Sequence, residues 1–268
     1  MDARNHLYLW DDRFLYVTPE IHSGLTARST TTLLLSAVGR PFRLAGMDGH
    51  AVHCEAALVA PHVPRCLDVG GDGLLSLNLD PSSAACRRVA ARIGGAGIEV
   101  LDPRVFGPLR EAFQPALDGD LSTAQLRRLS ADLIDAVVGT TCGERTLDPR
   151  VVRVMDALRD SVEPLPLDRL SRIACLSPDR LTHLFAQQAG LSIKRYALWS
   201  KMRRAMVQFG VGERLTDAAL IGGFTDAAHM SRAFRNHFGL APSFLARQVA
   251  VNTHPRVKPA GEAVLAAA

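Results

Sequence analysis

The sequence is short of cysteine and of aromatic residues, and it has no long apolar run. Its five cysteines are odd in number and scattered, which argues against a disulfide framework and predicts reduced thiols. No segment approaches the roughly 18 consecutive apolar residues that a membrane-spanning helix needs. The N-terminus has no apolar stretch of the kind found in secretion signals. We therefore expect a cytoplasmic protein with no membrane partner.

Motifs of the common enzyme classes are also missing. There is no glycine-rich phosphate loop, no GxSxG sequence, no HExxH sequence and no pair of cysteines with zinc spacing. The sequence therefore predicts no catalytic residues and no cofactor. It favours a protein that is not an enzyme.

Charge is distributed unevenly along the chain. Residues 1–145 carry 14 Lys and Arg against 17 Asp and Glu, whereas residues 146–250 carry 15 against 9. With 268 residues and 47% hydrophobic content, the chain can form two cores. We predict one domain over residues 1–145 and a second over 146–250. The excess of positive charge in the second domain is typical of a surface that meets nucleic-acid phosphates.

The segment Leu167–Gly190 predicts a helix-turn-helix unit. Apolar residues recur at helical spacing before and after a break at Ser177 and Pro178. Ser177 is a good N-cap, and Pro178 suits the first helical position because its missing N–H needs no partner there. A second helix therefore begins at Pro178.

The segment Leu215–Gly239 repeats this pattern. Gly222 and Gly223 interrupt the first apolar stripe, and Thr225 or Asp226 can cap the helix that follows. Between the two units, residues 193–208 predict a helix of about 24 Å at ~1.5 Å per residue. With the width of both units added, two second helices can lie about one DNA turn apart, roughly 34 Å. One chain is thus able to occupy two successive major grooves.

The run from Leu167 through Leu245 resembles the DNA-binding domain of the AraC/XylS family of bacterial transcription regulators. The family signature is matched by short stretches of this chain: Gly223-Phe224, Ser231-Arg232-Ala233-Phe234, Phe238-Gly239 and Pro242. The resemblance implies a sequence-specific regulator that binds double-stranded DNA, with RNA polymerase as a candidate second partner.

Placed on the family pattern, one set of side chains faces the DNA bases. This set is Asp179, Thr182, His183, Ala227, Ala228, His229 and Arg232. Arg232 is the strongest candidate for base recognition, because a guanidinium can bind guanine O6 and N7 with two hydrogen bonds. A second set is read as phosphate contacts or solvated side chains: Arg180, Lys194, Lys201, Arg203, Arg204, Arg235 and Asn236.

The first hundred residues predict β-structure. Short apolar runs alternate with turn residues, as in a small barrel or sandwich. The runs are Leu7–Trp10, Phe14–Val17, Thr32–Ala37, Phe42–Leu44, Ala57–Ala60 and Leu74–Leu79. The segment Ala57–Ser83 resembles the cupin-like sensor domains of many AraC/XylS proteins. The expected fold is therefore α+β: a small N-terminal β-barrel with following helices, then an all-α double helix-turn-helix domain.

A cupin-like barrel raises the question of a metal site. The candidate ligands are His22, His50, His53, Glu55 and His62. They include no His-x-His pair followed by a spaced Glu, and where relatives often have histidines this chain has residues 27–30 and Arg65. We therefore favour a metal-free pocket or a purely structural barrel.

Helices are expected to follow the β-region. Ser83–Ile93 carries Arg88 and Arg92, a weak candidate pair for a nucleotide effector because two arginines one turn apart can bind phosphates. Leu121–Val138 has one apolar stripe that packs either on the barrel or on a second subunit of a homodimer. Gly139–Arg145 is predicted to be a linker, Leu147–Arg159 a helix, and residues 251–268 a disordered tail.

These features predict a transcription regulator controlled by a small effector in the N-terminal barrel. Two alternatives are open. The first is a constitutive regulator whose barrel only forms a dimer. The second is a metal-cupin enzyme fused to a DNA-binding module.

Overall fold

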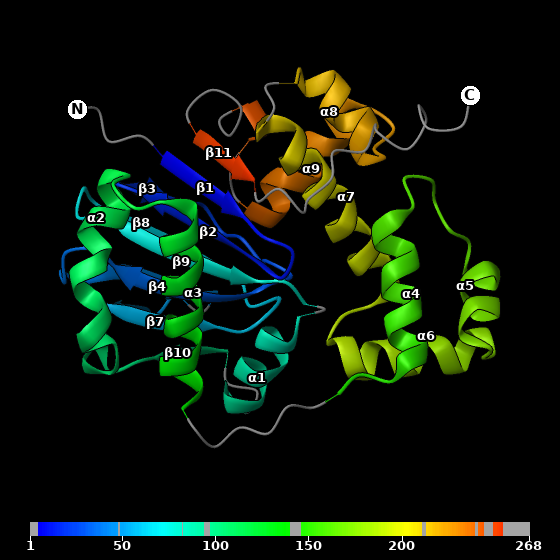
Figure 1. Ribbon diagram of the computed structural model, residues 1–268, viewed down its shortest axis with the longest axis horizontal. Helices are drawn as coiled ribbons and strands as arrows, with labels where there is room; N and C mark the ends of the chain where they lie inside the picture. The colour runs from blue at the N-terminus through cyan, green and yellow to red at the C-terminus, as the bar shows by residue number, and fades with distance from the viewer. Residues whose placement is uncertain are drawn as a thin grey trace.

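The chain folds into an N-terminal region of two β-sheets and a C-terminal region of helices (Figure 1). The computed structural model describes residues 5–47, 49–81, 83–93, 97–139, 146–210, 213–238, 241–243 and 249–253. The α+β class predicted from the sequence is confirmed.

The larger sheet has seven strands in the order β10-β7-β4-β9-β2-β1-β11. The strands are β1 (Asn5–Leu9), β2 (Arg13–Thr18), β4 (Thr31–Ser36), β7 (Ala56–Val59), β9 (Leu74–Leu79), β10 (Ile98–Val100) and β11 (Val249–Thr253). Successive side chains point to opposite faces of a strand, so this sheet is buried on both sides. On β4, Leu33 and Leu35 belong to one apolar cluster and Leu34 belongs to the other.

The smaller sheet has four strands in the order β3-β8-β5-β6. They are β3 (Ile21–His22), β5 (Phe42–Gly46), β6 (Ala51–Cys54) and β8 (Arg65–Val69). Leu44 and Leu67 of this sheet share one apolar cluster with Leu34 of the larger sheet. The described strands thus form a two-sheet domain with a core between the sheets. Closure of the sheets into a barrel stays a prediction.

Helices cover the other face of the larger sheet (Figure 1). They are α1 (Ala84–Ile93), a 3₁₀ helix (Pro103–Ala112), α2 (Phe113–Asp118) and α3 (Thr123–Val138). Ser122 and Gln125 form a capping box at the start of α3. The apolar stripe predicted for this helix is buried within the subunit, where Leu126 and Leu133 are fully covered. Of the two alternatives for this stripe, the structure supports packing on the β-domain.

Six helices form the described C-terminal region. They are α4 (Pro149–Asp160), α5 (Leu167–Ala174), α6 (Pro178–Ala189), α7 (Ile193–Gly210), α8 (Leu215–Gly222) and α9 (Ala227–Phe238). Helix α7 contacts α4, α6, α8 and α9, so it is the central element of this region. The predicted helix over residues 193–208 is confirmed and extends two residues further.

The C-terminal strand differs from the sequence prediction. Residues 251–253 were assigned to a disordered tail, but they lie in β11, which pairs in parallel with β1 of the N-terminal sheet. Residues 254–268, the rest of the predicted tail, lie outside the described residues. The same holds for residues 140–145 of the predicted linker, whereas Gly139 ends α3 as its C-cap.

Candidate nucleic-acid interface

Helices α5 and α6 form the first helix-turn-helix unit. Cys175 ends α5 with a left-handed backbone conformation, φ 53°. Ser177 caps α6, where its hydroxyl accepts a hydrogen bond from the Arg180 N–H at 3.4 Å, and Pro178 is the first helical residue. Leu181 and Phe185 are fully buried. The predicted break, cap and inward-facing side chains of this unit are confirmed.

The hydroxyl of Ser177 gives a first testable prediction. Ser177→Ala is expected to lower the free energy of unfolding by about 1 kcal/mol, because one N–H of the first turn of α6 loses its acceptor. Ser177→Asp keeps an acceptor at this position and serves as the matched control. Urea unfolding of the full chain measures both. Equal loss of stability in the two variants would show that the cap contributes nothing.

Helices α8 and α9 form the second unit. The Asp226 carboxylate accepts a hydrogen bond from the His229 N–H at 2.6 Å, so Asp226 is the cap of α9. This bond lowers the pKa of Asp226, with a smaller contribution from the Thr225 hydroxyl. Met230 and Phe234 are fully buried. Of the two caps considered from the sequence, the structure selects Asp226.

The two glycines at the C-terminal end of α8 have different roles. Gly222 lies against α7, and a Cβ there would come within 3.0 Å of the Ala205 Cβ. Gly223 has φ +86°, which a side chain disfavours, and its Cβ would meet the Val162 carbonyl oxygen at 2.6 Å. The pair therefore permits both the close packing of α8 on α7 and the turn toward α9.

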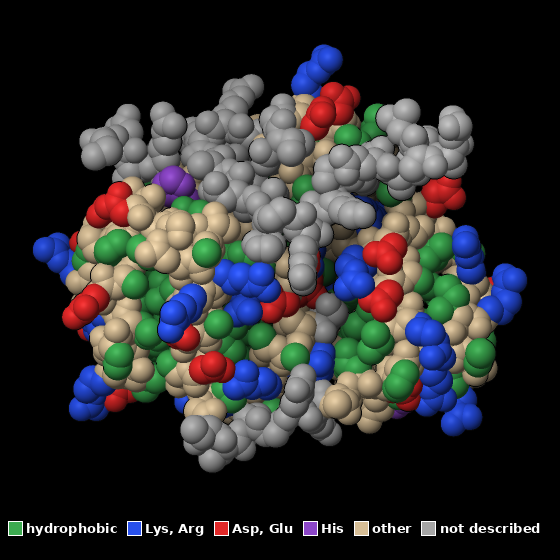
Figure 2. Space-filling view, viewed as in Figure 1, with side chains coloured by type: hydrophobic (Ala, Val, Ile, Leu, Met, Phe, Trp, Pro, Cys, Tyr) green, Lys and Arg blue, Asp and Glu red, His purple; other side chains and the backbone are tan. Residues whose placement is uncertain are grey.

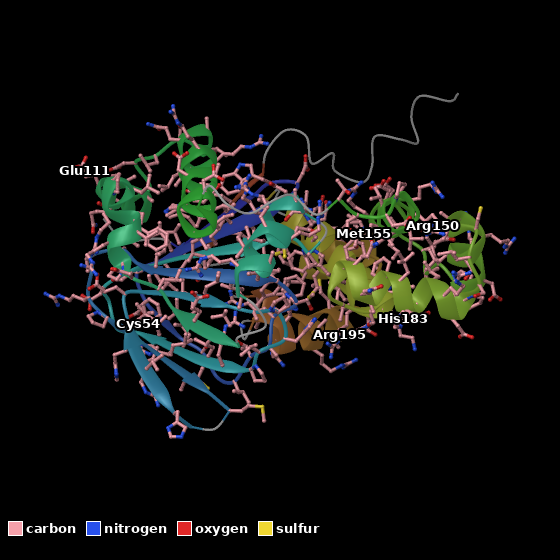
Figure 3. The ribbon with its side chains drawn as sticks, turned by 90° about the horizontal axis from the view of Figure 1, so that it is seen from below. Cys54, Glu111, Arg150, Met155, His183 and Arg195 are labelled. Atoms are coloured by element: carbon pink, nitrogen blue, oxygen red, sulfur yellow. The ribbon has the colours of Figure 1, made fainter. Side chains whose placement is uncertain are left out.

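The side chains predicted to face bases are mostly exposed. Five of the seven are exposed, and the other two are half-buried at the start of α9. The exposed residues are Asp179, Thr182, His183, Ala228 and Arg232, and the half-buried ones are Ala227 and His229. In Figure 3, His183 of α6 and Arg195 of α7 lie along one side of the helical region.

Two of these side chains already have hydrogen-bond partners nearby in the chain. The Thr182 hydroxyl donates to the Pro178 carbonyl oxygen at 2.8 Å. The His229 Nδ1 lies 3.1 Å from the Thr225 hydroxyl. Arg232 is the more accessible hydrogen-bonding group on α9, because its side chain is exposed. The assignment of these residues to base contacts stays a prediction.

The cations predicted to contact phosphates fall into two groups. Arg180, Lys194 and Arg235 are exposed, whereas Lys201 is half-buried and its pKa is lowered by burial and by Arg204. The side chain of Asn236 lies outside the described residues. Figure 2 shows Lys and Arg side chains gathered over α4–α6. Exposure suits Arg180, Lys194 and Arg235 for contact with a DNA backbone, and this assignment stays a prediction.

Arg203 and Arg204, by contrast, are committed to contacts within the protein. Arg204 donates to the Arg159 carbonyl oxygen at 2.8 Å and to the Gly222 carbonyl oxygen at 3.2 Å. Arg203 donates to the carbonyl oxygens of Trp10 and Asp11 in the N-terminal domain. In this arrangement neither guanidinium is a solvated side chain, so the sequence assignment of this pair needs revision.

The contact between domains was not predicted from the sequence. Asp80, 2% exposed, follows β9 and accepts hydrogen bonds from the Trp199 indole N–H at 2.8 Å and from Arg203 at 3.1 Å. The Trp199 ring lies 5.8 Å from the ring of Phe14 on β2. Helix α7 thus connects the two helix-turn-helix units and also binds the N-terminal sheet. Trp199 and Arg203 lie one helical turn apart in the sequence, and this spacing was the available sequence signal for a contact through one face of α7.

The weak effector candidates Arg88 and Arg92 are both ion-paired. Arg88 donates to Asp135 of α3 at 3.0 Å, and Arg92 contacts Glu99 of β10. The carboxylates of Asp135 and Glu99 therefore occupy guanidinium N–H groups that a phosphate would need. A nucleotide effector at this pair would have to displace both carboxylates.

Within the part of the chain that the structure describes, no three His, Cys, Asp or Glu side chains gather as metal ligands would. None of its helices is long and apolar enough to cross a membrane.

Comparison with known proteins bears on the helical region. The sequence model of the helix-turn-helix domain family matches residues 170–248. The arabinose operon regulatory protein of Escherichia coli (strain K12) is 29% identical over 122 residues, covering 36% of this chain and 41% of that protein. Over its C-terminal helices the chain is therefore similar to AraC-type helix-turn-helix proteins.

A further curated relative is the uncharacterized HTH-type transcriptional regulator YpdC of E. coli (strain K12). It is 30% identical over 81 residues, covering 30% of this chain and 28% of the relative. The chain thus matches less than half the length of either curated relative.

Solved structures resemble this chain over most of its length. A ToxT variant without ligand, from Vibrio cholerae strain SCE256, has a TM-score of 0.58 at 9% identity, covering 87% of this chain and 97% of that one. Wild-type ToxT of the same strain, bound to an unsaturated fatty acid, has a TM-score of 0.55 at 10% identity, covering 89% and 96%. At such identities the likeness shows the fold alone.

Proposed function

We propose that this chain is a sequence-specific, DNA-binding transcription regulator. The observation that carries the proposal is the pair of capped helix-turn-helix units joined by the single helix α7. In such units the second helix enters the major groove with residues near its N-terminus facing the bases. Here those helices are α6, whose first turn carries the exposed Asp179 and Arg180, and α9, whose first turn carries the exposed Ala228 and the half-buried His229.

A binding selection from random duplex DNA tests this function. The full chain is used, because β11 and α7 contact the N-terminal domain. Two short enriched blocks about 10 base pairs apart, one helical turn, are expected. A single block would mean that the α9 unit holds phosphates without reading bases. Failure to enrich any sequence would overturn the proposal.

Arg232 supplies a prediction about base recognition. Arg232→Ala is expected to cost about 1–3 kcal/mol of binding free energy and to relax the preference at one base pair, because a bidentate contact with guanine is lost. The exposed Arg235 on the same helix gives the matched control. Arg235→Ala is expected to weaken binding to all sequences alike and to lower the salt dependence.

Competitive binding with single-base variants of the selected site measures both substitutions. If Arg232→Ala leaves affinity and base preference unchanged, Arg232 takes no part in recognition. A base-specific effect of Arg235→Ala would contradict its assignment as a phosphate contact.

The N-terminal domain is proposed to bind a small effector that changes how the helices meet DNA. Support comes from the docking of α7 and α9 on this domain, since a ligand that favours one domain arrangement shifts DNA affinity. ToxT, which has a similar fold, has been solved with an unsaturated fatty acid. A constitutive regulator with a purely dimerising N-terminal domain predicts DNA binding that no small molecule alters.

A further inference from the structure

One guanidinium group lies where the ends of two helices meet. Arg204, half-buried on α7, donates through Nη1 to the carbonyl oxygens of Leu158 at 3.4 Å and Arg159 at 2.8 Å, in the last turn of α4. Through Nη2 it donates to the carbonyl oxygen of Gly222, the last residue of α8, at 3.2 Å. The described hydrogen bonds of this side chain are thus divided between two helix C-termini.

The two helices are associated with different helix-turn-helix units. Helix α4 contacts α5 and α6 of the first unit, whereas α8 contacts α9 within the second. Helix α7 lies between α4 and α8 and contacts both of them (Figure 1). The Arg204 side chain is therefore a polar link from the central helix to both units at once.

The chemistry of a helix end explains why an arginine suits this place. The last four carbonyl groups of an α-helix have no partner within the helix, and they carry the negative end of the helix dipole. A guanidinium offers five N–H donors in a planar fork, so its two terminal nitrogens can bind two helix ends that lie in different directions. A lysine offers one nitrogen, which acts as a point charge without this fixed fork.

A second contact joins the same two helix ends. The carbonyl oxygen of Val162, just after α4, lies so close to Gly223 that a Cβ on this glycine would come within 2.6 Å of it. The same Cβ would lie 3.4 Å from the Arg204 Nη2. The segment after α4 therefore packs directly against the turn between α8 and α9. We call Arg204, its three carbonyl acceptors and the Val162–Gly223 contact the inter-unit brace.

The Arg204 guanidinium is held inside the protein. Its Nε is buried without a hydrogen-bond partner. Burial lowers the pKa of Arg204, and the nearby Asp160 charge opposes this effect only in part. Both terminal nitrogens are bound to carbonyl oxygens. The side chain thus serves contacts between helices and is not available to a DNA phosphate.

Apolar packing alone defines the angle between the units less well. On α8, Gly222 lies against α7, where a Cβ on this glycine would come within 3.0 Å of the Ala205 Cβ. The hydrophobic effect that favours such close packing is non-directional, whereas hydrogen bonds depend on direction. The brace therefore resists a rotation of α8 about α7 that the contact between two small residues permits.

The angle between the units matters because the half-sites on DNA are related by the turn of the double helix. In the proposed complex, α6 and α9 enter major grooves about one turn apart. One additional base pair between the half-sites moves the second groove by about 3.4 Å and rotates it by roughly 34°. A protein whose units are fixed relative to each other can follow only one spacing.

We infer that Arg204 is a positioning residue that sets the half-site spacing accepted by this protein. In this role it contacts no base. It fixes α6 and α9 relative to each other through the ends of α4 and α8. The inference rests on the proposed function, since it concerns a complex in which both units bind DNA.

The test compares binding of the full chain to DNA duplexes that differ only in spacing. The two blocks recovered from the binding selection are kept, and the separation between them is changed by one or two base pairs in either direction. We expect the wild type to bind one spacing at least tenfold more tightly than its neighbours. Arg204→Met removes the donors and keeps a side chain of similar length. We expect this variant to lose about tenfold of the spacing preference, the effect of one lost hydrogen bond to a charged group.

Two other variants separate positioning from charge and from stability. Arg204→Lys keeps the positive charge without the planar fork, so we expect wild-type salt dependence together with a reduced spacing preference. Arg195→Met, at an exposed position of α7 outside the brace, is the matched control and keeps the wild-type spacing preference. Binding is measured below the Tm of every variant, and Arg204→Lys decides the question if Arg204→Met does not fold.

Several results would overturn the inference. One is an unchanged spacing preference in the Arg204 variants. Another is a loss of affinity by the same factor at every spacing, which is the effect of a residue that only stabilises the fold or only binds phosphate. Recovery of a single block, or equal binding at all spacings, by the wild type would also overturn it and leave the proposed function intact. Failure of the wild type to enrich any sequence overturns the proposed function itself.

Discussion

Trp199→Ala is expected to lower the free energy of unfolding by about 3–5 kcal/mol, the usual cost of emptying a buried tryptophan site. The Trp199 side chain is 2% exposed and contacts the rings of Phe14 and Phe238. Its indole N–H also donates to the buried Asp80 carboxylate. The substitution removes apolar packing and a charge-assisted hydrogen bond at once. Urea unfolding followed by circular dichroism measures the loss.

Two further variants serve as controls for the loss of stability in Trp199→Ala. Trp199→Phe keeps most of the apolar surface and loses only the N–H donor, so its effect should be smaller than that of Trp199→Ala. Leu220→Ala, at a position 59% exposed on α8, should change stability by less than about 0.5 kcal/mol. An effect of Trp199→Ala no larger than that of Leu220→Ala would show that the docked arrangement does not contribute to stability.

The position of Trp199 also links stability to regulation. The residue lies on α7, which contacts both helix-turn-helix units, and its ring packs on the N-terminal sheet. A change in docking is therefore transmitted to the helix that sets the separation of α6 and α9. For this reason we expect Trp199→Ala to reduce the difference in DNA binding between the effector-bound and the effector-free protein.

Local sequence patterns predicted the helix-turn-helix units well. Their determinants lie within a few residues of each other: the cap at Ser177, the proline that follows it, the left-handed turn at Gly223 and the cap at Asp226. The same is true of the strands with strong apolar runs. Leu74–Leu79 was predicted with the bounds that the structure gives, and five other strands were predicted within two residues.

The elements that sequence analysis missed depend on distant partners. Strands β6 and β8 carry polar residues such as His53 and Asp68 and have no strong apolar run. Strand β11 follows the DNA-binding region and is ordered by pairing with β1, nearly 250 residues away. No local signal records such a pairing, because the propensity of a short strand depends on its neighbours.

The burial of Arg28 and Arg65 was missed for a similar reason. Arg65 and residues 27–30 were noted only as positions where relatives often have metal-binding histidines. Their burial depends on the packing of α9 against the two-sheet domain, which the sequence does not report. Likewise, Arg203 looked like one more cation of a basic helix, since its partner Asp80 lies 123 positions earlier in the chain. Periodicity identifies a helix face but not what the face contacts.

Phe234→Ala is expected to lower the free energy of unfolding by about 3–5 kcal/mol and to disable the second helix-turn-helix unit. Phe234 is fully buried on α9, with the ring of Phe209 of α7 at 5.9 Å and that of Phe238 at 5.3 Å. These rings hold α9 against α7. Loss of the contact should shorten the region of DNA protected from nuclease digestion to the half-site read by α6.

Footprinting on the selected site tests this prediction, with Leu220→Ala as the matched truncation at an exposed position of the same unit. We expect Leu220→Ala to protect both half-sites and Phe234→Ala to protect one. Protection of both half-sites by Phe234→Ala would mean that α9 reaches the groove without its core contact to α7. Loss of both half-sites would mean that α6 cannot bind DNA alone, because the two units depend on each other through α7 for a stable complex.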